Sequence, residues 1–130
     1  RERNVAPLIY QDKINLLARS VEEEGKLDFC HEAGIGVIAF SPLAQGLLTP
    51  RYLNGIPEDS RMAKHGSLSA DVLTPELLEQ LRTWNAEAIE QGETMVTMAL
   101  KWVLAQKGVT SVIVGARTPE QFAESLKCLY

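Results

Sequence analysis

Three short apolar segments, separated by stretches with helical periodicity, constrain the fold of this 130-residue chain more than any other feature. Residues 8–10, 35–40 and 110–114 are rich in strand-forming side chains and are bounded by polar or turn residues. The second segment is continuously apolar apart from one glycine and ends at Ser41-Pro42, which is typical of a buried strand. A strand, a helix and a further strand in this order indicate a parallel sheet with a crossover connection.

Helical patterns fill the intervals between these strands. The predicted helices cover residues 21–33, 75–91, 95–107 and the segment that follows 118. Ser20 and Glu23 have the spacing of a capping box at the start of the first helix. Thr74, Thr94 and Thr118 are expected to cap the other three, two of them followed by a first-turn proline. The two middle helices are expected to pack as one crossover.

The resulting order, β-α-β-αα-β-α, places the chain in the α/β class as one unit without internal repeats. A complete (β/α)₈ barrel needs about 250 residues, and a doubly wound sheet has five or six strands, so three strands leave either architecture incomplete. Open strand edges favour association. We therefore expect a homo-oligomer or a piece of a larger protein, and a start at Arg1 without an initiating Met agrees with the second reading.

Composition excludes several classes of function. A formal net charge of −4 and a pI near 5.2 argue against binding to a phosphate backbone, so we expect no nucleic-acid partner. The apolar runs are far shorter than the roughly 18 residues of a membrane span, so we expect no membrane segment. Cys30 and Cys128 lack partners at metal-ligand or redox spacing, which favours a reducing compartment and a cytoplasmic protein.

The carboxyl ends of the strands are where α/β folds place their chemistry. The third strand leads through Gly115-Ala116-Arg117 into a helix whose first backbone N–H groups we expect to be free for an anion. A phosphate fits there, and Arg117 favours a ribose 2′-phosphate, hence NADP over NAD. An ordinary capped helix with a solvated Arg117 explains the same residues equally well. Residues 41–71 lack sustained periodicity, and a loop of that length is usually functional.

Two linked motifs resemble those of the aldo-keto reductases. The segment 40–49 reads FSPLAQGLLT and looks like the seventh-strand signature of that family. Further segments are similar to the branch of the family with glyceraldehyde 3-phosphate reductase-like enzymes and potassium-channel β-subunits. They are Arg51-Tyr52, Gly55-Ile56-Pro57, Ser60-Arg61 and the closing segment 115–121, GARTPEQ. The resemblance covers nearly the whole chain, with both motifs in the expected order.

This resemblance implies a partial (β/α)₈ TIM barrel, about its last three βα units. Residues 1–130 would form the C-terminal half-barrel, with 41–73 as a long cofactor loop. The implied cofactor is NADP(H), and the implied reaction of the full-length parent is reduction of a small carbonyl substrate by hydride transfer.

The family's cofactor contacts carry over position by position. Phe40 would stack on the nicotinamide ring, where many relatives have Tyr or Trp, and Gln11, at the end of the first strand, would hydrogen-bond its carboxamide. The implied pyrophosphate contacts are Ser41, Leu43, Gly46 and Arg51. The implied 2′-phosphate contacts are Gly115, Arg61, Arg117 and Gln121. Glu124 and Ser125 would lie near the adenine. Arg51 replaces a common Lys, and Ser125 a common Asn.

The family's Asp, Tyr, Lys and His set, in which the Tyr donates the proton, belongs to earlier strands that these 130 residues do not contain. Tyr10 beside Asp12-Lys13 is interpreted as a strand-end polar cluster, so no catalytic residue is assigned. We expect the chain to bind NADP(H) but to be inactive alone, its missing N-terminal half supplying the chemistry.

Other functions and other sites are weaker explanations. The alternative is a non-catalytic module: a self-associating half-barrel or a nucleotide-sensing subunit. A doubly wound dehydrogenase is disfavoured because Gly34-Ile35-Gly36 precedes its strand and lacks the third glycine of the dinucleotide motif. Adjacent Cys30 and His31 point about 100° apart on a helix, so we expect a buried thiol and an exposed imidazole. His65 is left unassigned, and no metal site is expected.

Overall fold

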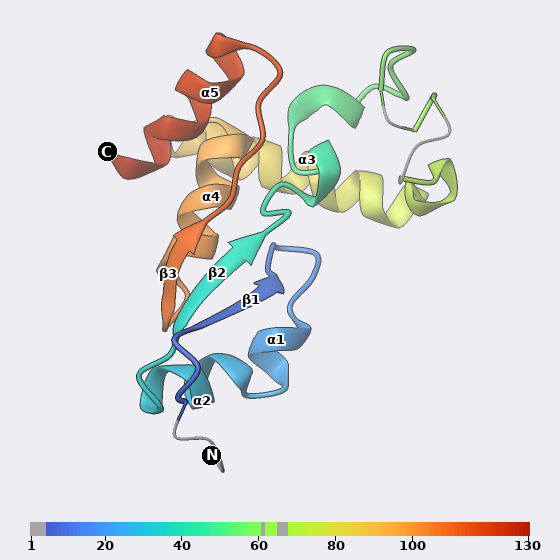
Figure 1. Cartoon of the computed structure of the whole chain (residues 1–130). Coiled ribbons are helices and arrows are strands. Elements are labelled where there is room, and N and C mark those ends of the chain that lie inside the picture. Colours follow the sequence, from blue (N-terminus) through green and yellow to red (C-terminus); the bar gives the residue numbers. More distant parts are fainter. Residues whose placement is uncertain (1–4, 61, 65–67) are drawn as a thin grey trace.

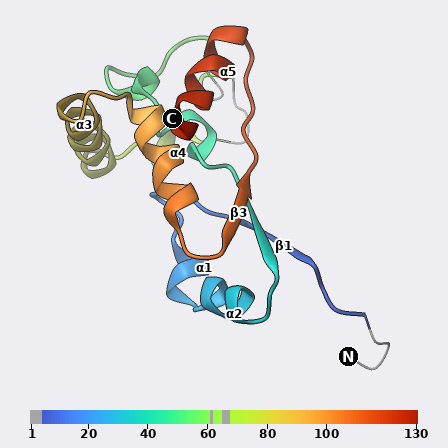
Figure 2. The ribbon, with the colours of Figure 1, turned by 90° about the vertical axis from the view of Figure 1, so that its left-hand side faces the viewer.

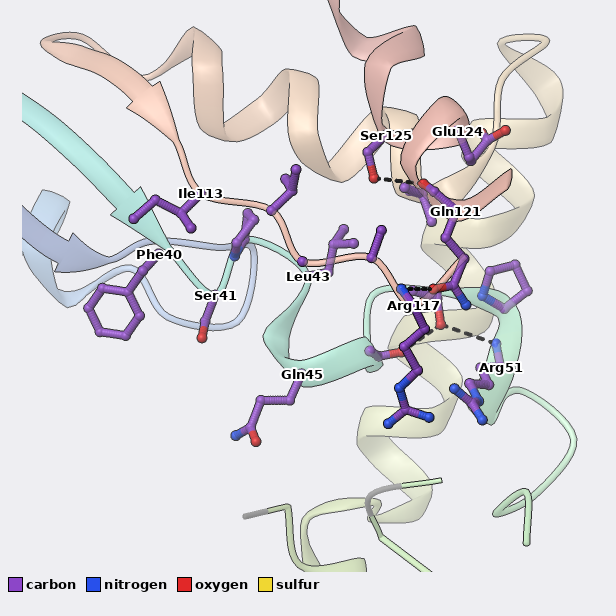
Figure 3. Close-up of a pocket in the computed structure, with 18 of the residues that line it drawn as sticks. Phe40, Ser41, Leu43, Gln45, Arg51, Ile113, Arg117, Gln121, Glu124 and Ser125 are labelled. Carbon is purple, nitrogen blue, oxygen red and sulfur yellow. Dashed lines mark hydrogen bonds between the residues drawn. The ribbon is translucent and has the colours of Figure 1, made fainter. Parts of the chain in front are cut away.

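A three-stranded parallel sheet forms the centre of the computed structural model, which describes residues 5–60, 62–64 and 68–130 (Figure 1). Strand β2 (Gly36–Phe40) pairs with β1 (Ile9–Lys13) on one side and with β3 (Val109–Val112) on the other. Because the strands are parallel, their carboxyl ends lie at one edge, and the segments that follow β2 and β3 approach helix α5 there (Figure 3).

Strand β1 departs from the prediction in length and in burial. The prediction of a buried strand over residues 8–10 is wrong. The strand pairs with β2 over residues 9–13, with Ile9 opposite Gly36 and Lys13 opposite Phe40. Leu8, just before β1, and Ile9 are 78% and 61% exposed, because β1 is one of the two edge strands of this sheet and little of the chain packs against its start. Backbone pairing with β2 therefore extends the strand past its apolar residues into a polar segment. Strand β3 likewise begins one residue earlier and ends two residues earlier than predicted.

The predicted single helix over 21–33 is also wrong. The chain forms a short helix α1 (Ser20–Glu23) and then α2 (Lys26–Glu32), with Gly25 between them at a left-handed φ of 74°. A continuous helix cannot pass through that backbone conformation, which glycine adopts without steric cost. The N-cap of α1 is Arg19 and makes no side-chain capping bond, so the predicted capping box does not form.

The threonine caps are confirmed. Helices α3 (Pro75–Glu90), α4 (Met95–Ala105) and α5 (Pro119–Leu126) each begin directly after one of the three predicted threonines. In each case the threonine Oγ1 accepts a hydrogen bond from a backbone N–H of the first helical turn. Four single turns of 3₁₀-helix complete the fold: Ala44–Gly46, Pro50–Tyr52, Ala70–Val72 and Lys127–Leu129.

Helices cover one face of the sheet (Figure 2). Val37 and Ala39 of β2 are fully buried and belong to a cluster with Ile14, which follows β1, and with residues of α1, α2 and α4: Val21, Leu27, Cys30 and Val103. Side chains alternate along a strand, so Ile38 and Phe40 point to the opposite face, where both are only half-buried. As predicted, Cys30 is buried and His31 is exposed.

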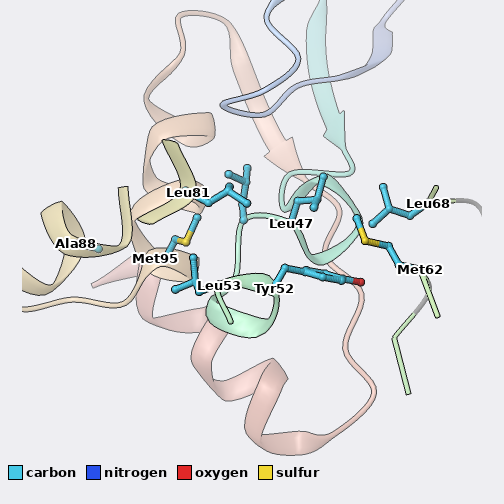
Figure 4. Close-up of a cluster of buried hydrophobic side chains, with 10 residues drawn as sticks. Leu47, Tyr52, Leu53, Met62, Leu68, Leu81, Ala88 and Met95 are labelled. Carbon is cyan, nitrogen blue, oxygen red and sulfur yellow. The ribbon is translucent and has the colours of Figure 1, made fainter. Parts of the chain in front are cut away.

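A second buried cluster joins the segment after β2 to α3 and α4 (Figure 4). It consists of Leu47, Leu48, Tyr52, Leu53, Met62, Leu68, Leu81, Ala88, Met95 and Ala99. The described residues of the predicted loop over 41–73 thus include three 3₁₀ turns and are anchored by apolar side chains of the same segment. Within the described residues, no helix is both long enough and apolar enough to cross a membrane.

Two truncations on α3 test the importance of this second cluster. Leu81→Ala, at a fully buried position, is expected to lower the free energy of unfolding by about 2 to 5 kcal/mol, because a cavity replaces the lost side chain. Ile89→Ala is the matched control: its side chain is 65% exposed, and the expected change is within about 0.5 kcal/mol. Urea unfolding followed by circular dichroism measures both. Equal losses in the two variants would contradict the packing described here.

Candidate functional site

A cavity of about 760 Å³ opens at the carboxyl ends of β2 and β3. Three segments form its walls: the stretch from Phe40 to Tyr52 after β2, the stretch from Ile113 to Arg117 after β3, and one side of α5. Val96 of α4 completes the lining. The cavity therefore lies where parallel α/β sheets usually place their ligands.

Ten of the twelve predicted site residues line this cavity. They are Phe40, Ser41, Leu43, Gly46, Arg51, Gly115, Arg117, Gln121, Glu124 and Ser125. Gln11 is not among the lining residues: it lies in the middle of β1 opposite Ile38, so its predicted place at the strand end is wrong. Arg61 lies outside the described residues.

The backbone after β2 has an unusual conformation. Ser41, Ala44 and Gln45 have φ values of 50°, 49° and 59°, in the left-handed region that residues other than glycine rarely adopt. Backbone strain of this kind concentrates at functional sites. The Ser41 carbonyl oxygen accepts hydrogen bonds from Ala44 N at 3.1 Å and from the Asn15 side-chain amide at 2.8 Å. The segment is thus held in a bent path along the cavity wall.

Arg51 is placed beside the cavity by its own short helix. Thr49 Oγ1 donates to the Gly46 carbonyl at 2.6 Å and accepts from Arg51 N at 3.3 Å, so the start of this 3₁₀ turn is fixed. The Arg51 guanidinium forms an ion pair with Asp59, with an Nη2–Oδ2 distance of 2.6 Å. Hydrogen bonding to Arg51 lowers the pKa of Asp59. An anion that binds Arg51 would therefore compete with this carboxylate.

The start of α5 is more fully satisfied than predicted. Gln121 Oε1 accepts a hydrogen bond from Arg117 N at 2.9 Å, and Gln121 N donates to Thr118 Oγ1 at 3.2 Å. The expectation that the first N–H groups of α5 are free is therefore wrong for Gln121 N, and the N–H of Arg117, just before the helix, is occupied as well. In Figure 3 the Arg117 side chain points away from α5, toward the side of the cavity with Gln45 and Arg51. Two cationic groups thus stand along one side of the cavity.

Glu124 turns toward α4 (Figure 3). Its carboxylate accepts hydrogen bonds from Thr94 Oγ1, from Thr97 Oγ1 at 3.2 Å and from Lys127 Nζ at 2.6 Å. The bond from Lys127, followed by the one from Thr94, lowers the pKa of Glu124. Glu124 therefore ties α5 to the capped start of α4. Ser125 is buried, and its hydroxyl donates to the Gln121 carbonyl at 3.1 Å within the helix.

Sequence reasoning missed part of the lining. These residues are Pro42, Gln45, Thr49, Pro50, Tyr52, Val96, Ile113, Val114 and Ala116. The strand-end rule, applied to the whole segment after β3, would have included Ile113, Val114 and Ala116. Val96 carries no such signal, because it comes from the first turn of α4 and reaches the cavity only through helix packing.

The lining suits a ligand that combines flat rings with several negative charges. Phe40 and Ile113 at the strand ends supply apolar surface, and Arg51 and Arg117 supply positive charge. The backbone N–H groups of Gly115 and Ala116 make no hydrogen bond to other described residues and stand at the cavity wall. These groups can hold an anion on one side of the cavity and an apolar ring at the strand ends.

The Aldo/keto reductase family model matches residues 1–129. The chain is 48% identical over 132 residues to an L-glyceraldehyde 3-phosphate reductase of Escherichia coli O157:H7, an alignment that covers 98% of this chain and 38% of that protein. It is 36% identical over 129 residues to a putative voltage-gated potassium channel subunit beta of Schizosaccharomyces pombe, covering 96% of this chain and 38% of the relative. The chain thus spans 38% of the length of these relatives.

Solved structures show the same similarity. The glycerol dehydrogenase of Gluconobacter oxydans superimposes with a TM-score of 0.78 at 26% identity, covering 98% of this chain and 39% of that one. A thermostable aldo-keto reductase in complex with the inhibitor epalrestat gives a TM-score of 0.63 at 26% identity. The match covers 93% of this chain and 34% of that one.

The Glu124 contacts predict a stability that depends on pH. The folded pKa lies below the ordinary value of 4.5, so ionised Glu124 stabilises the fold above about pH 4.5, and this stabilisation is lost as the pH falls through the lowered pKa. Glu124→Gln should therefore be less stable than wild type at neutral pH, and the difference should shrink in acid. Urea unfolding at several pH values measures it.

A second comparison identifies the partner of Glu124. In a Lys127→Met background, Glu124→Gln should cost less at neutral pH, because the largest contribution to the lowered pKa is gone. A Glu124→Gln effect that is the same in both backgrounds and at every pH would contradict the described contacts.

Proposed function

The chain belongs to the aldo/keto reductase family, and on this premise we propose that it supplies the NADP(H)-binding part of a reductase acting on small carbonyl compounds. The family has a (β/α)₈ barrel fold, and the α/β structure with three parallel strands is consistent with part of one. We assign the chain to about the last three βα units. Residues 1–130 then form the C-terminal half-barrel, with 41–73 as the cofactor loop.

The observation that carries this proposal is the convergence of two sequence motifs on one cavity. The segments after β2 and after β3 are far apart in the sequence, yet they face each other across the same space. One wall presents Phe40 at a strand end, and the other presents Gly115 and Arg117 before a helix. An apolar ring site and a phosphate site at the two ends of one cavity are what a dinucleotide requires.

The nicotinamide is proposed to lie at the strand ends. When bound, NADPH supplies the hydride for reduction of a carbonyl carbon. Phe40 stacks on one ring face and leaves the other open. Gln11 is proposed to hold the carboxamide: its register with Ile38 puts it on the same uncovered face of the sheet as Phe40.

The phosphates are proposed to lie along the cationic side. Ser41, Leu43 and Gly46 line the pyrophosphate, with Arg51 as its cation once Asp59 is displaced. Gly115, Arg117, Gln121 and Arg61 are assigned to the 2′-phosphate, and Glu124 and Ser125 to the adenine side. Arginine suits phosphate because its planar donors can bind two oxygens at once.

Carbonyl reduction also needs a proton donor, and these 130 residues do not contain the family's Asp, Tyr, Lys and His set. Tyr10 donates to Asp12 Oδ2 at 2.5 Å, and this hydrogen bond raises the pKa of the Tyr10 hydroxyl, which opposes a role as proton donor at neutral pH. We propose that the chain alone binds nucleotide without turnover. A cytoplasmic location is proposed from its two free cysteines.

A second candidate function is a nucleotide-sensing or self-associating module without catalysis. The similarity to potassium channel subunits beta favours it, as do the exposed apolar side chains of Leu8 and Ile9. Self-association is a prediction of this alternative and of the open strand edges, and light scattering of the purified chain measures it.

Nucleotide titration tests the leading proposal. Wild type is expected to bind NADPH more tightly than NADH. The fluorescence of the nucleotide measures the binding. Arg117→Met should weaken NADPH binding about tenfold and leave NADH binding nearly unchanged. The variant loses a charge-assisted hydrogen bond to the 2′-phosphate, and only NADPH carries that phosphate. Lys107→Met is the matched control: this lysine pairs with Asp28, remote from the cavity, and its loss should change neither affinity. Equal affinity of folded wild type for both nucleotides would overturn the 2′-phosphate assignment.

Turnover distinguishes binding from catalysis. The 130-residue chain with NADPH and a small aldehyde is expected to show no consumption of NADPH above the rate without protein, because no positioned proton donor is present. The absorbance of NADPH measures this. Consumption that scales with protein concentration, and that Arg117→Met reduces, would show that the chain carries its own catalytic group.

A further inference from the structure

Asn15 is a buried polar residue that lies outside the cavity and yet contacts its wall. It follows β1 by two residues and is 1% exposed. Two backbone hydrogen bonds join it to Ala18: Ala18 N donates to Asn15 O at 3.0 Å, and Asn15 N donates to Ala18 O at 3.3 Å. Its side-chain Oδ1 accepts a hydrogen bond from Leu17 N at 2.9 Å. A buried amide with hydrogen-bond partners at both its oxygen and its nitrogen is held in one orientation.

The amide nitrogen of this side chain contacts a distant part of the sequence. Asn15 Nδ2 donates to the Ser41 carbonyl oxygen at 2.8 Å, between residues 26 positions apart. Beside it, Ile14 N donates to the Phe40 carbonyl at 3.4 Å. The turn after β1 is thereby joined to the two residues at which β2 ends and the cavity wall begins.

The Ser41 peptide is where the direction of the chain changes. Phe40 is the last residue of β2, and Ser41 already has a left-handed φ of 50°. The same carbonyl oxygen accepts from Ala44 N, whose own φ is 49°. A non-glycine residue stays in this conformation only when its surroundings impose it, and the Asn15 amide is one such constraint.

We propose that Asn15 is a positioning residue for the cavity: its amide holds the Ser41 carbonyl, and through it the left-handed path that brings Leu43 and Gln45 to the wall. Asn15 touches no ligand in this proposal. The effect of Asn15 on affinity rests on the proposed binding of NADP(H). Its effect on the backbone conformation of residues 41–45 does not depend on any ligand.

Two variants isolate the one hydrogen bond. Asn15→Asp keeps the oxygen that accepts from Leu17 N and replaces the donor by a second oxygen facing the Ser41 carbonyl. Asn15→Ser is neutral, keeps a short acceptor for Leu17 N and is too short to reach Ser41. If the buried charge of the first prevents folding, the second still removes the contact. Leu27→Ala is the control for lost stability, since it empties a buried position of α2, whose residues do not line the cavity.

The first readout is spectroscopic. The ¹³C chemical shifts of Ser41, Ala44 and Gln45 are measured in the folded chain without ligand, because Cα and Cβ shifts follow φ and ψ. Both Asn15 variants should move these shifts away from left-handed values, and Leu27→Ala should not. Unchanged shifts in the Asn15 variants, or the same change in Leu27→Ala, would overturn the positioning role.

The second readout is the affinity for NADPH. Each Asn15 variant should raise the Kd about fivefold or more, the fold-change that corresponds to the usual net contribution of one hydrogen bond, whereas Leu27→Ala should stay near wild type. If wild type does not bind NADPH, the proposed function fails and the shifts alone decide the role of Asn15. If wild type binds and the shifts move while the Kd of the variants stays constant, Asn15 does not position the binding wall.

Discussion

The parallel pairing of β2 with a strand on each side is the constraint on which the rest of the structure depends. It brings the ends of β2 and β3 to one edge, so that segments distant in sequence share a cavity. Gly36 lies where this pairing begins: a Cβ there would stand 3.2 Å from Thr110 Oγ1 and 3.7 Å from the Leu8 carbonyl oxygen. A larger residue at this position would require the Thr110 side chain to give way by a few tenths of an ångström, so the space between the strands is nearly filled there.

Elements with a local signal were predicted from the sequence, and elements set by distant partners were not. The threonine caps of α3, α4 and α5 are visible in a few neighbouring residues, and all three form as expected. The extension of β1 to Lys13 depends on pairing with Phe40. The break at Gly25 did have a local signal, since glycine weakens a helix, but the capping-box spacing of Ser20 and Glu23 outweighed it.

The candidate site shows the same division. Motif resemblance identified most of the lining, because it reports residue types at fixed places after β2 and β3. It could not reveal that Glu124 faces Thr94 and Thr97 of another helix, or that Gln121 closes onto Arg117 N. These orientations depend on which hydrogen-bond partners the fold supplies. A residue type at a motif position therefore predicts membership of the site more reliably than it predicts what the side chain does there.

The distance along the chain between the two cavity walls also bears on how the protein folds. Residues 41–73, α3 and α4 lie between the β2 end and the β3 end, so the cavity forms only when segments far apart in the sequence come together. Contacts of high sequence separation are slow to form, because chain entropy is lost before they stabilise anything. The cavity walls, like the β2–β3 pairing itself, therefore depend on contacts that are slow to form. A ligand that bridges both walls would stabilise the folded chain, and it would slow unfolding to the extent that its contacts are absent from the folding transition state.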